Sequence, residues 1–259
     1  MKNLWCKSDF VTTIGYDKSW ENLYFLERCK QQGRMPNAVI KILPLKLRRI
    51  TYLLKNRGLK AIWEYFNNTP LKGQCQTRCK KMEVNDPSIY NWCIKNSVNY
   101  ISIRNQEQVS RHPGLKYLRN TLCVYNGGGI LTEKFIRNFK AIINAHGAKL
   151  PEIRGIKGVE WSILLGQPIG VTLHLIDNGI DTGEIIIFKQ LRRSGFETIQ
   201  NLYDRNKLLA KDILIEAICN SNFDTSLSKI QLMRSEKYKL CTKLSNALEE
   251  IVYKINEHP

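Results

Sequence analysis

Short apolar runs alternate with helix-like segments from residue 86 to residue 219, and this alternation constrains the fold more than any other feature. The runs typical of strands lie at 98–103, 121–125, 141–144, 170–176 and 184–190. The segments with helical features lie at 86–96, 106–118, 132–139, 159–165 and 196–219. Strands that alternate with helices favour an α/β fold, in which a Rossmann-like, mainly parallel, twisted sheet is flanked by helices.

The N-terminal part of the chain is expected to add to the same sheet. Strands are predicted at 10–15 and 38–43, and helices at 18–32 and 45–66. The last two strands of the alternation are joined only by the loop at 177–183, which is too short for a parallel crossover. At least one strand of the sheet should therefore be antiparallel to its neighbours.

The chain of 259 residues is long enough for one large domain with an appendage. We expect the domain over residues 1–219 and a C-terminal helical extension over 220–259. A helix predicted at 238–255 carries its apolar residues on one stripe. This helix is expected to pack on the domain or to form a contact between two copies of the chain.

The formal net charge of +17 is distributed unevenly. Between Arg34 and Met82 there are 12 Lys and Arg residues but one acidic residue, Glu64, which gives 12 − 1 = +11 of the +17. A basic stretch of this kind is typical of proteins that bind a nucleotide diphosphate, a nucleic acid or an acidic membrane surface. It is equally compatible with a solvated basic face of two helices.

We expect a cytoplasmic protein without a membrane span, because no apolar run approaches 18 residues and the N-terminus does not resemble a secretory signal. The eight cysteines are scattered and are expected to be reduced thiols. Cys75 and Cys79 form the only close pair, and no second pair or histidine cluster accompanies it. We therefore predict no metal site.

Three consecutive glycines, Gly127, Gly128 and Gly129, follow the strand predicted at 121–125. They are not a phosphate-binding loop, because neither Gly-Lys-Ser/Thr nor Gly-x-Gly-x-x-Gly is present. They expose backbone at the C-terminal end of a strand, where open α/β sheets bind ligands. A flat heterocycle is able to lie against such backbone, although an ordinary turn is the other interpretation.

Asn144-Ala145-His146 follows the next strand, and Asp181 lies in the sequence Asp-Asn-Gly-Ile-Asp-Thr-Gly 35 residues later. Residues two apart on a strand point the same way, so Asn144 and His146 should emerge together. An amide can polarise a carbonyl, an imidazole can move a proton near neutral pH, and a carboxylate can orient the imidazole. This set is suited to acyl transfer to an amine.

These residues belong to a longer pattern, which comprises Asn144-x-His146, Leu150-Pro151-x-x-Arg154-Gly155, Trp161, Gly170-Val171-Thr172-x-His174 and Asp177-x-Gly179-x-Asp181-Thr182-Gly183. The pattern resembles the core of the folate-dependent formyltransferases, over residues 125–218. Gly147 and Ala148 depart from it, since the family often has Pro and Ser there. The first 80 residues do not show the family's usual opening strand and loop clearly.

The resemblance implies that N10-formyltetrahydrofolate is the formyl donor and that residues 1–219 are the catalytic domain. It implies that Asn144, His146 and Asp181 are the catalytic residues, while His174 has a supporting or structural role. The pterin would lie between two segments and be recognised largely by main-chain groups. These segments are 127–131 and the loop 177–181, and the residues implied to bind the pterin are Gly127, Gly128, Gly129, Ile130, Leu131, Asp177, Asn178 and Gly179.

Among these enzymes, the sugar N-formyltransferases are the most similar to this chain. Only 40 residues follow Cys219, fewer than the further domain of enzymes that act on initiator tRNA, and the Gly-Ser-Asn loop of glycinamide ribonucleotide enzymes is absent. The resemblance implies a nucleotide-linked (dTDP, UDP or GDP) amino sugar as acceptor, a role in surface polysaccharide biosynthesis, and a homodimer. An aminoacyl-tRNA or another amine is the alternative acceptor. The alternative that is not an enzyme is a basic nucleic-acid-binding protein on the same scaffold. The charge of the chain permits this alternative, but the presence of all three catalytic residues disfavours it.

Overall fold

The structure is a computed structural model, which describes residues 8–42, 86, 88–115, 117–118, 121–127, 129–193, 197–220, 240–242 and 244–257. The predicted helix at 45–66, the Cys75–Cys79 pair and Gly128 lie outside the described residues. Most of the basic stretch from Arg34 to Met82 does so as well.

The described strands are β1 (Phe10–Ile14), β2 (Ala38–Ile42), β3 (Asn99–Ile103), β4 (Leu122–Asn126), β5 (Ala141–His146), β6 (Arg154–Gly155), β7 (Gly170–Leu175), β8 (Ile185–Gln190) and β9 (Leu240–Cys241). The described α-helices are α1 (Trp20–Gln31), α4 (Ile89–Lys95), α5 (Glu133–Ile136), α6 (Gly158–Leu164), α7 (Ile199–Cys219) and α8 (Asn246–Glu257). Two short 3-10 helices are η2 (Gln106–Arg111) and η3 (Pro113–Leu115).

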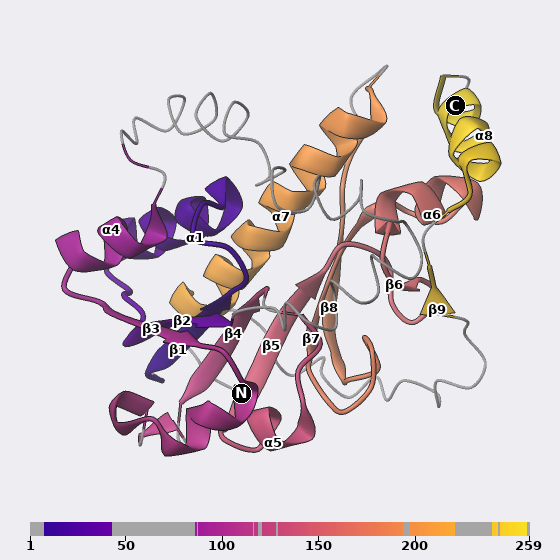
Figure 1. Cartoon of the computed structure of the whole chain (residues 1–259). Coiled ribbons are helices and arrows are strands. Elements are labelled where there is room, and N and C mark those ends of the chain that lie inside the picture. Colours follow the sequence, from indigo (N-terminus) through magenta and orange to yellow (C-terminus); the bar gives the residue numbers. More distant parts are fainter. Residues whose placement is uncertain are drawn as a thin grey trace, which may run out of the picture.

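Within the described part of the chain, seven strands form one sheet in the order β3-β2-β1-β4-β5-β7-β8 (Figure 1). Neighbours from β3 to β5 are parallel, whereas β7 is antiparallel to both β5 and β8. The predicted α/β class, the mainly parallel sheet and the antiparallel strand are thereby confirmed. The strand order reverses beside β1, so a ligand crevice is expected at the C-terminal ends of β1 and β4.

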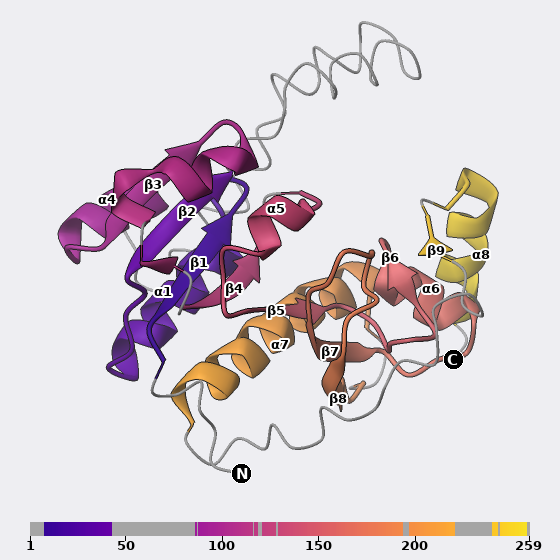
Figure 2. The ribbon, with the colours of Figure 1, turned by 90° about the horizontal axis from the view of Figure 1, so that it is seen from below.

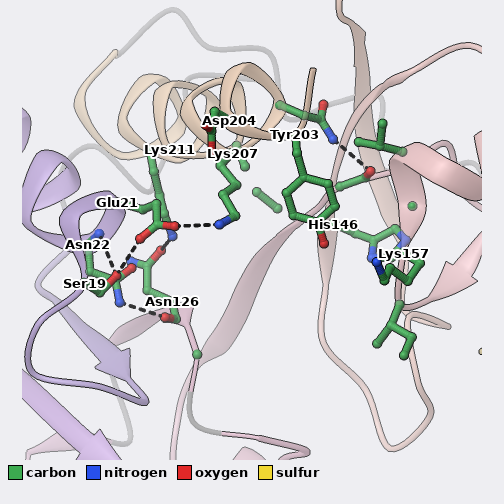
Figure 3. Close-up of a pocket in the computed structure, with 18 of the residues that line it drawn as sticks. Ser19, Glu21, Asn22, Asn126, His146, Lys157, Tyr203, Asp204, Lys207 and Lys211 are labelled. Carbon is green, nitrogen blue, oxygen red and sulfur yellow. Dashed lines mark hydrogen bonds and ion pairs between the residues drawn. The ribbon is translucent and has the colours of Figure 1, made fainter. Parts of the chain in front are cut away.

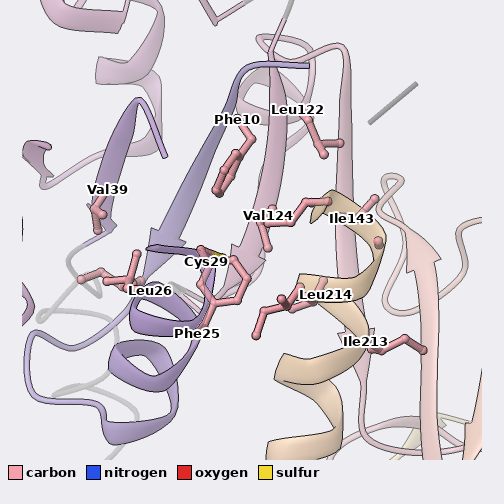
Figure 4. Close-up of a cluster of buried hydrophobic side chains, with 14 of the residues drawn as sticks. Phe10, Phe25, Leu26, Cys29, Val39, Leu122, Val124, Ile143, Ile213 and Leu214 are labelled. Atoms are coloured by element: carbon pink, nitrogen blue, oxygen red, sulfur yellow. The ribbon is translucent and has the colours of Figure 1, made fainter. Parts of the chain in front are cut away.

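Helices cover both faces of the sheet (Figures 1 and 2). On one face α1, α4 and α7 bury Phe10, Val124 and Ile143 together with Phe25 and Leu214 (Figure 4). On the other face η2, η3 and α5 cover the alternate residues of the same strands, such as Val11 beside Phe10. Each large side chain that is fully buried in this way stabilises the fold by roughly 1.5–3 kcal/mol.

Side-chain caps set the start of most helices. Ser19, Ser88, Thr132 and Thr198 each accept a hydrogen bond from the backbone N–H three residues later, at the starts of α1, α4, α5 and α7. The cap at Thr198 explains why α7 begins at Ile199 instead of at 196. These polar caps set the boundaries that hydrophobic periodicity leaves open.

Three further predicted segments differ from the structure. The helix predicted at 106–118 is divided into η2 and η3, because Pro113 has no N–H and Asn105 with Gln108 forms a tight capping box. The C-terminal helix begins at 246 instead of 238, because Leu240 and Cys241 pair with β6. The strand predicted at 141–144 continues to His146, because its last residues pair with β7.

Candidate active site

Asn144 and His146 lie within β5, where they pair with His174 and Thr172 of β7. The two candidate residues therefore point to the same side of the sheet, as the sequence predicts. A register shift between Leu173 and His174 interrupts the pairing of β7 with β8. Such irregularities reorient nearby side chains and are common beside functional sites.

His174 holds the amide of Asn144 through a neutral imidazole. Its Nδ1 lies 2.7 Å from the Leu175 carbonyl oxygen, and a carbonyl oxygen can only accept, so Nδ1 carries the proton. The Nε2 atom then accepts a hydrogen bond from Asn144 Nδ2 at 3.0 Å. Burial lowers the pKa of His174 to about 4, which keeps the ring neutral at physiological pH.

His146 is 8% exposed and contacts two oxygens. Its Nε2 donates to the Ile153 carbonyl oxygen at 2.8 Å, which leaves Nδ1 as the atom that gains or loses a proton. Nδ1 lies 3.4 Å from Asp181 Oδ2. A protonated His146 would thus be held between a carbonyl and a carboxylate.

Asp181 lies in the loop between β7 and β8 with a φ of 52°, a left-handed conformation that Asp and Asn tolerate better than most residues. Its Oδ2 accepts a hydrogen bond from the backbone N–H of Gly155 at 2.8 Å. Asp177 shapes the same loop, because its Oδ1 accepts from Gly179 N and Thr182 Oγ1. The loop therefore presents a fixed carboxylate to His146.

A cavity of about 260 Å³ lies on one side of these residues. Gly129, Ile130 and Leu131 line it from one segment, and Asp177 with Gly179–Asp181 lines it from the loop between β7 and β8. Asn144 of β5, His174 of β7 and Tyr125 of β4 also line it. Five of the predicted pterin-binding residues thus face one cavity: Gly129, Ile130, Leu131, Asp177 and Gly179.

Of the other predicted pterin-binding residues, Gly127 and Asn178 do not line this cavity, and Gly128 lies outside the described residues. Asn178 is exposed in the loop and does not line the smaller cavity. Gly127 lines a second cavity, because its φ of 115° turns the chain away from β4 beside Gly15. A Cβ atom on Gly127 would lie 3.3 Å from Gly15 N, so close approach of the two strand ends favours glycine there.

The second cavity is larger, about 860 Å³, and occupies the expected crevice at the ends of β1 and β4 (Figure 3). His146 lines it, whereas Asn144 and Asp181 line the smaller cavity. The contact between His146 and Asp181 therefore lies between the two cavities. Four lysines and four aromatic side chains contribute to the larger one: Lys18, Lys157, Lys207, Lys211, Tyr16, Trp20, Tyr203 and Tyr253.

One face of α7 forms a wall of the larger cavity, with Tyr203, Lys207 and Lys211 spaced four residues apart. Lys207 Nζ is 2.9 Å from Glu21 Oε1 of α1, and Lys211 Nζ donates to Asn126 Oδ1 at 2.6 Å. Burial lowers the pKa of Lys211 to about 8. These residues are not among those predicted from the sequence, although their spacing of four on one helix is a recognisable signal.

No helix among the described residues is long and apolar enough to cross a membrane. Those residues also contain no group of three or more His, Cys, Asp or Glu side chains arranged to hold a metal ion.

The family model described as "Formyl transferase" matches residues 82–218, a range that contains Asn144, His146 and Asp181. The chain belongs to the formyl transferase family. Among curated proteins, the chain is similar to a methionyl-tRNA formyltransferase from Desulfotalea psychrophila, with 38% identity over 77 residues, or 29% of this chain and 24% of that protein. This chain spans between 24% and 47% of the length of such relatives.

Solved structures of the family share the fold. A sugar N-formyltransferase from Shewanella sp FDAARGOS_354 is 15% identical, with a TM-score of 0.54 and with 96% of this chain and 87% of that chain covered. Glycinamide ribonucleotide transformylase 1 from Symbiobacterium toebii is also 15% identical, with a TM-score of 0.53 and coverage of 82% and 85%. At these identities the likeness establishes the fold.

The depressed pKa of His174 predicts acid sensitivity. Below about pH 6.5 the unfolded chain binds a proton at this residue, whereas the folded chain leaves it neutral down to about pH 4. Protons therefore favour unfolding in this window, and His174 should lower the free energy of unfolding by roughly 1–3 kcal/mol as the pH falls through it.

Urea denaturation at a series of pH values measures this effect. His174→Gln retains an acceptor for Asn144 but does not titrate, so its midpoint should fall less than that of the wild type between about pH 6.5 and about pH 4. If the urea midpoints of the two proteins fell equally over this pH range, the conclusion that His174 is buried and neutral would be contradicted.

Proposed function

We propose that this chain is an N-formyltransferase that moves a formyl group from N10-formyltetrahydrofolate to the amine of a nucleotide-linked amino sugar. The observation that carries the proposal is the position of Asn144, His146 and Asp181 between two cavities of different character. A transferase of this kind needs a donor site and an acceptor site that meet at the reacting atoms. The family assignment is consistent with the same chemistry.

The smaller cavity fits the folate donor. Ile130 and Ile180 are exposed large apolar side chains that line it from two separate segments, and they offer apolar surfaces to a flat ring. The hydroxyl of Tyr125 donates to the Gly129 carbonyl oxygen at 2.8 Å and ties Gly129 to β4. The pterin would lie between these two segments and hydrogen-bond to the main chain of both.

The formyl oxygen gains negative charge when the acceptor amine attacks the formyl carbon. Asn144 Nδ2 carries two N–H groups, of which His174 takes one. The second N–H would donate to the formyl oxygen. A preorganised donor of this kind lowers the barrier by roughly 3 kcal/mol.

His146 moves the proton of the reaction. Nδ1 accepts the proton of the attacking amine, because Nε2 is already bonded to Ile153. Asp181, 3.4 Å from Nδ1, stabilises the imidazolium. As the C–N bond of the donor breaks, its electron pair returns to the folate nitrogen, and His146 delivers the proton to that nitrogen.

The larger cavity supports a nucleotide-linked acceptor. Its aromatic side chains suit a planar base, and its four lysines exceed its three carboxylates, Glu21, Glu160 and Asp204, which favours an anionic group such as a phosphate. Aminoacyl-tRNA is the second candidate, because the curated relatives are named methionyl-tRNA formyltransferases. Both acceptors carry a base and a phosphate, so the cavity alone does not choose between them.

The test is a turnover assay with purified protein and N10-formyltetrahydrofolate. A panel of dTDP-, UDP- and GDP-linked amino sugars is compared with the same nucleotides lacking the amine and with methionyl-tRNA. We expect release of tetrahydrofolate that depends on at least one amino sugar. Release of tetrahydrofolate with methionyl-tRNA alone would support aminoacyl-tRNA as the acceptor instead. No release with any acceptor would reject the proposed function.

A further inference from the structure

The C-terminal segment reaches the candidate site through β9. Gly155 pairs with Cys241, and Ile156 N donates to the Cys241 carbonyl oxygen at 3.3 Å. The N–H of Gly155 is also the group that holds the carboxylate of Asp181. A Cβ on Gly155 would lie 2.3 Å from the Cys241 oxygen, which shows how closely the C-terminal segment packs against the strand beside the site.

The helix α8 is anchored firmly beside this contact. Val252 is fully buried in a cluster with Ile199 and Leu244, against which Trp161 of α6 packs. Asn256 Nδ2 donates to the Glu197 carbonyl oxygen at 2.8 Å, so the helix is also held to the start of α7. These contacts fix the orientation of α8 beside α6 (Figure 2).

Because α8 is fixed, Tyr253 has a defined place at the larger cavity. Its side chain is 56% exposed, although its neighbour Val252 is buried. Glu249, one turn earlier on the same side of α8, lies 3.6 Å from Lys157 Nζ. Lys157 and Tyr253 both line the larger cavity, as does Tyr203 of α7, so this wall combines aromatic rings from two helices with a lysine.

We propose that Tyr253 is a specificity-determining residue, which stacks on the planar base of a nucleotide in the larger cavity. This inference rests on the proposed function, since it assigns a place to the nucleobase of that acceptor. An exposed tyrosine at a cavity mouth offers a flat face at a small cost in conformational entropy. Stacking tolerates different bases, so the role of Tyr253 is to favour a base-bearing acceptor over a bare phosphate or sugar.

In this arrangement the C-terminal extension has a function in the site itself. The helix α8 would complete the acceptor cavity, and β9 would brace the strand that holds Asp181. A second copy of the chain is not needed for either contact, because both are made within one chain.

The experiment measures binding of UDP, dTDP, GDP and inorganic pyrophosphate to the full-length chain by calorimetry. Tyr253→Ala should weaken binding of the preferred nucleotide about tenfold, as is typical when a stacking ring is removed. Pyrophosphate has no base, so its affinity should not change. Tyr253→Phe keeps the ring and should bind the nucleotide within about twofold of the wild type.

Lys254→Ala is the matched control, because Lys254 is the next residue of α8, is exposed and does not line the cavity. It should bind the nucleotides as the wild type does. Equal nucleotide affinity of Tyr253→Ala and the wild type, or failure of the wild type to bind any of the three, would overturn the inference. Binding that depends on Tyr253 without formyl transfer would reject the proposed function and leave this inference standing.

Discussion

His146→Asn should reduce formyl transfer by roughly 10²- to 10⁴-fold, the range expected when a general acid–base group is lost. Asparagine keeps an amide N–H that is able to donate to the Ile153 carbonyl oxygen, but no atom remains that can accept and return a proton. The smaller cavity does not include His146, so donor binding should be retained. Single-turnover release of tetrahydrofolate, with donor affinity measured separately, tests both parts of this prediction.

His112→Asn is the control for this substitution. His112 lies at the surface between η2 and η3, where its Nδ1 accepts from Gly114 N. Activity of this variant should stay within about twofold of the wild type, because surface substitutions away from a site have small effects. Full activity of His146→Asn, or loss of donor binding in that variant, would contradict the assigned role.

The α/β fold is well predicted from the sequence, because local patterns specify it. Buried strands such as β4 and β5 are short apolar runs, and polar caps such as Thr132 and Thr198 mark where helices begin. The antiparallel strand follows from the length of the loop between β7 and β8 alone. Each of these features depends on residues close together in the sequence.

The partners of the predicted site residues are less accessible to sequence reasoning. His174 contacts Asn144 because β7 pairs with β5 in one particular register, and alternation along a single strand does not reveal the register. Asp181 receives its hydrogen bond from Gly155, which lies in a two-residue strand too short to recognise from a pattern. Both contacts arise from the tertiary fold.

Apart from the spacing of four on α7, the larger cavity is not predictable from the sequence. Its walls combine Gly15 and Glu21 near the N-terminus with Lys207 of α7 and Tyr253 of α8. These residues are separated by up to 238 positions and share no motif, since 253 − 15 = 238. The parallel packing of α1 and α7 brings Gly15, Glu21 and Lys207 together. In this packing Tyr24 also donates to Asp212 at 2.6 Å.

Asp181→Asn should reduce formyl transfer by roughly 10²- to 10³-fold, a loss typical of removing one preorganised electrostatic group. Asparagine tolerates the left-handed backbone at φ 52°, and its side-chain oxygen can still accept from Gly155 N. The substitution therefore removes the charge beside His146 Nδ1 while it preserves the loop. Turnover and the thermal midpoint of the same preparation separate the loss of charge from a loss of folding.

Asp177→Asn provides the comparison within the same loop. The Oδ1 atom of Asp177 accepts from Gly179 N and Thr182 Oγ1, contacts that an amide oxygen can also make. The turnover of this variant should fall by less than about tenfold, because the carboxylate of Asp177 has no histidine ring nitrogen among its hydrogen-bonding partners. Similar losses in the two variants would indicate that the net charge of the loop, and not the Asp181–His146 contact, supports catalysis.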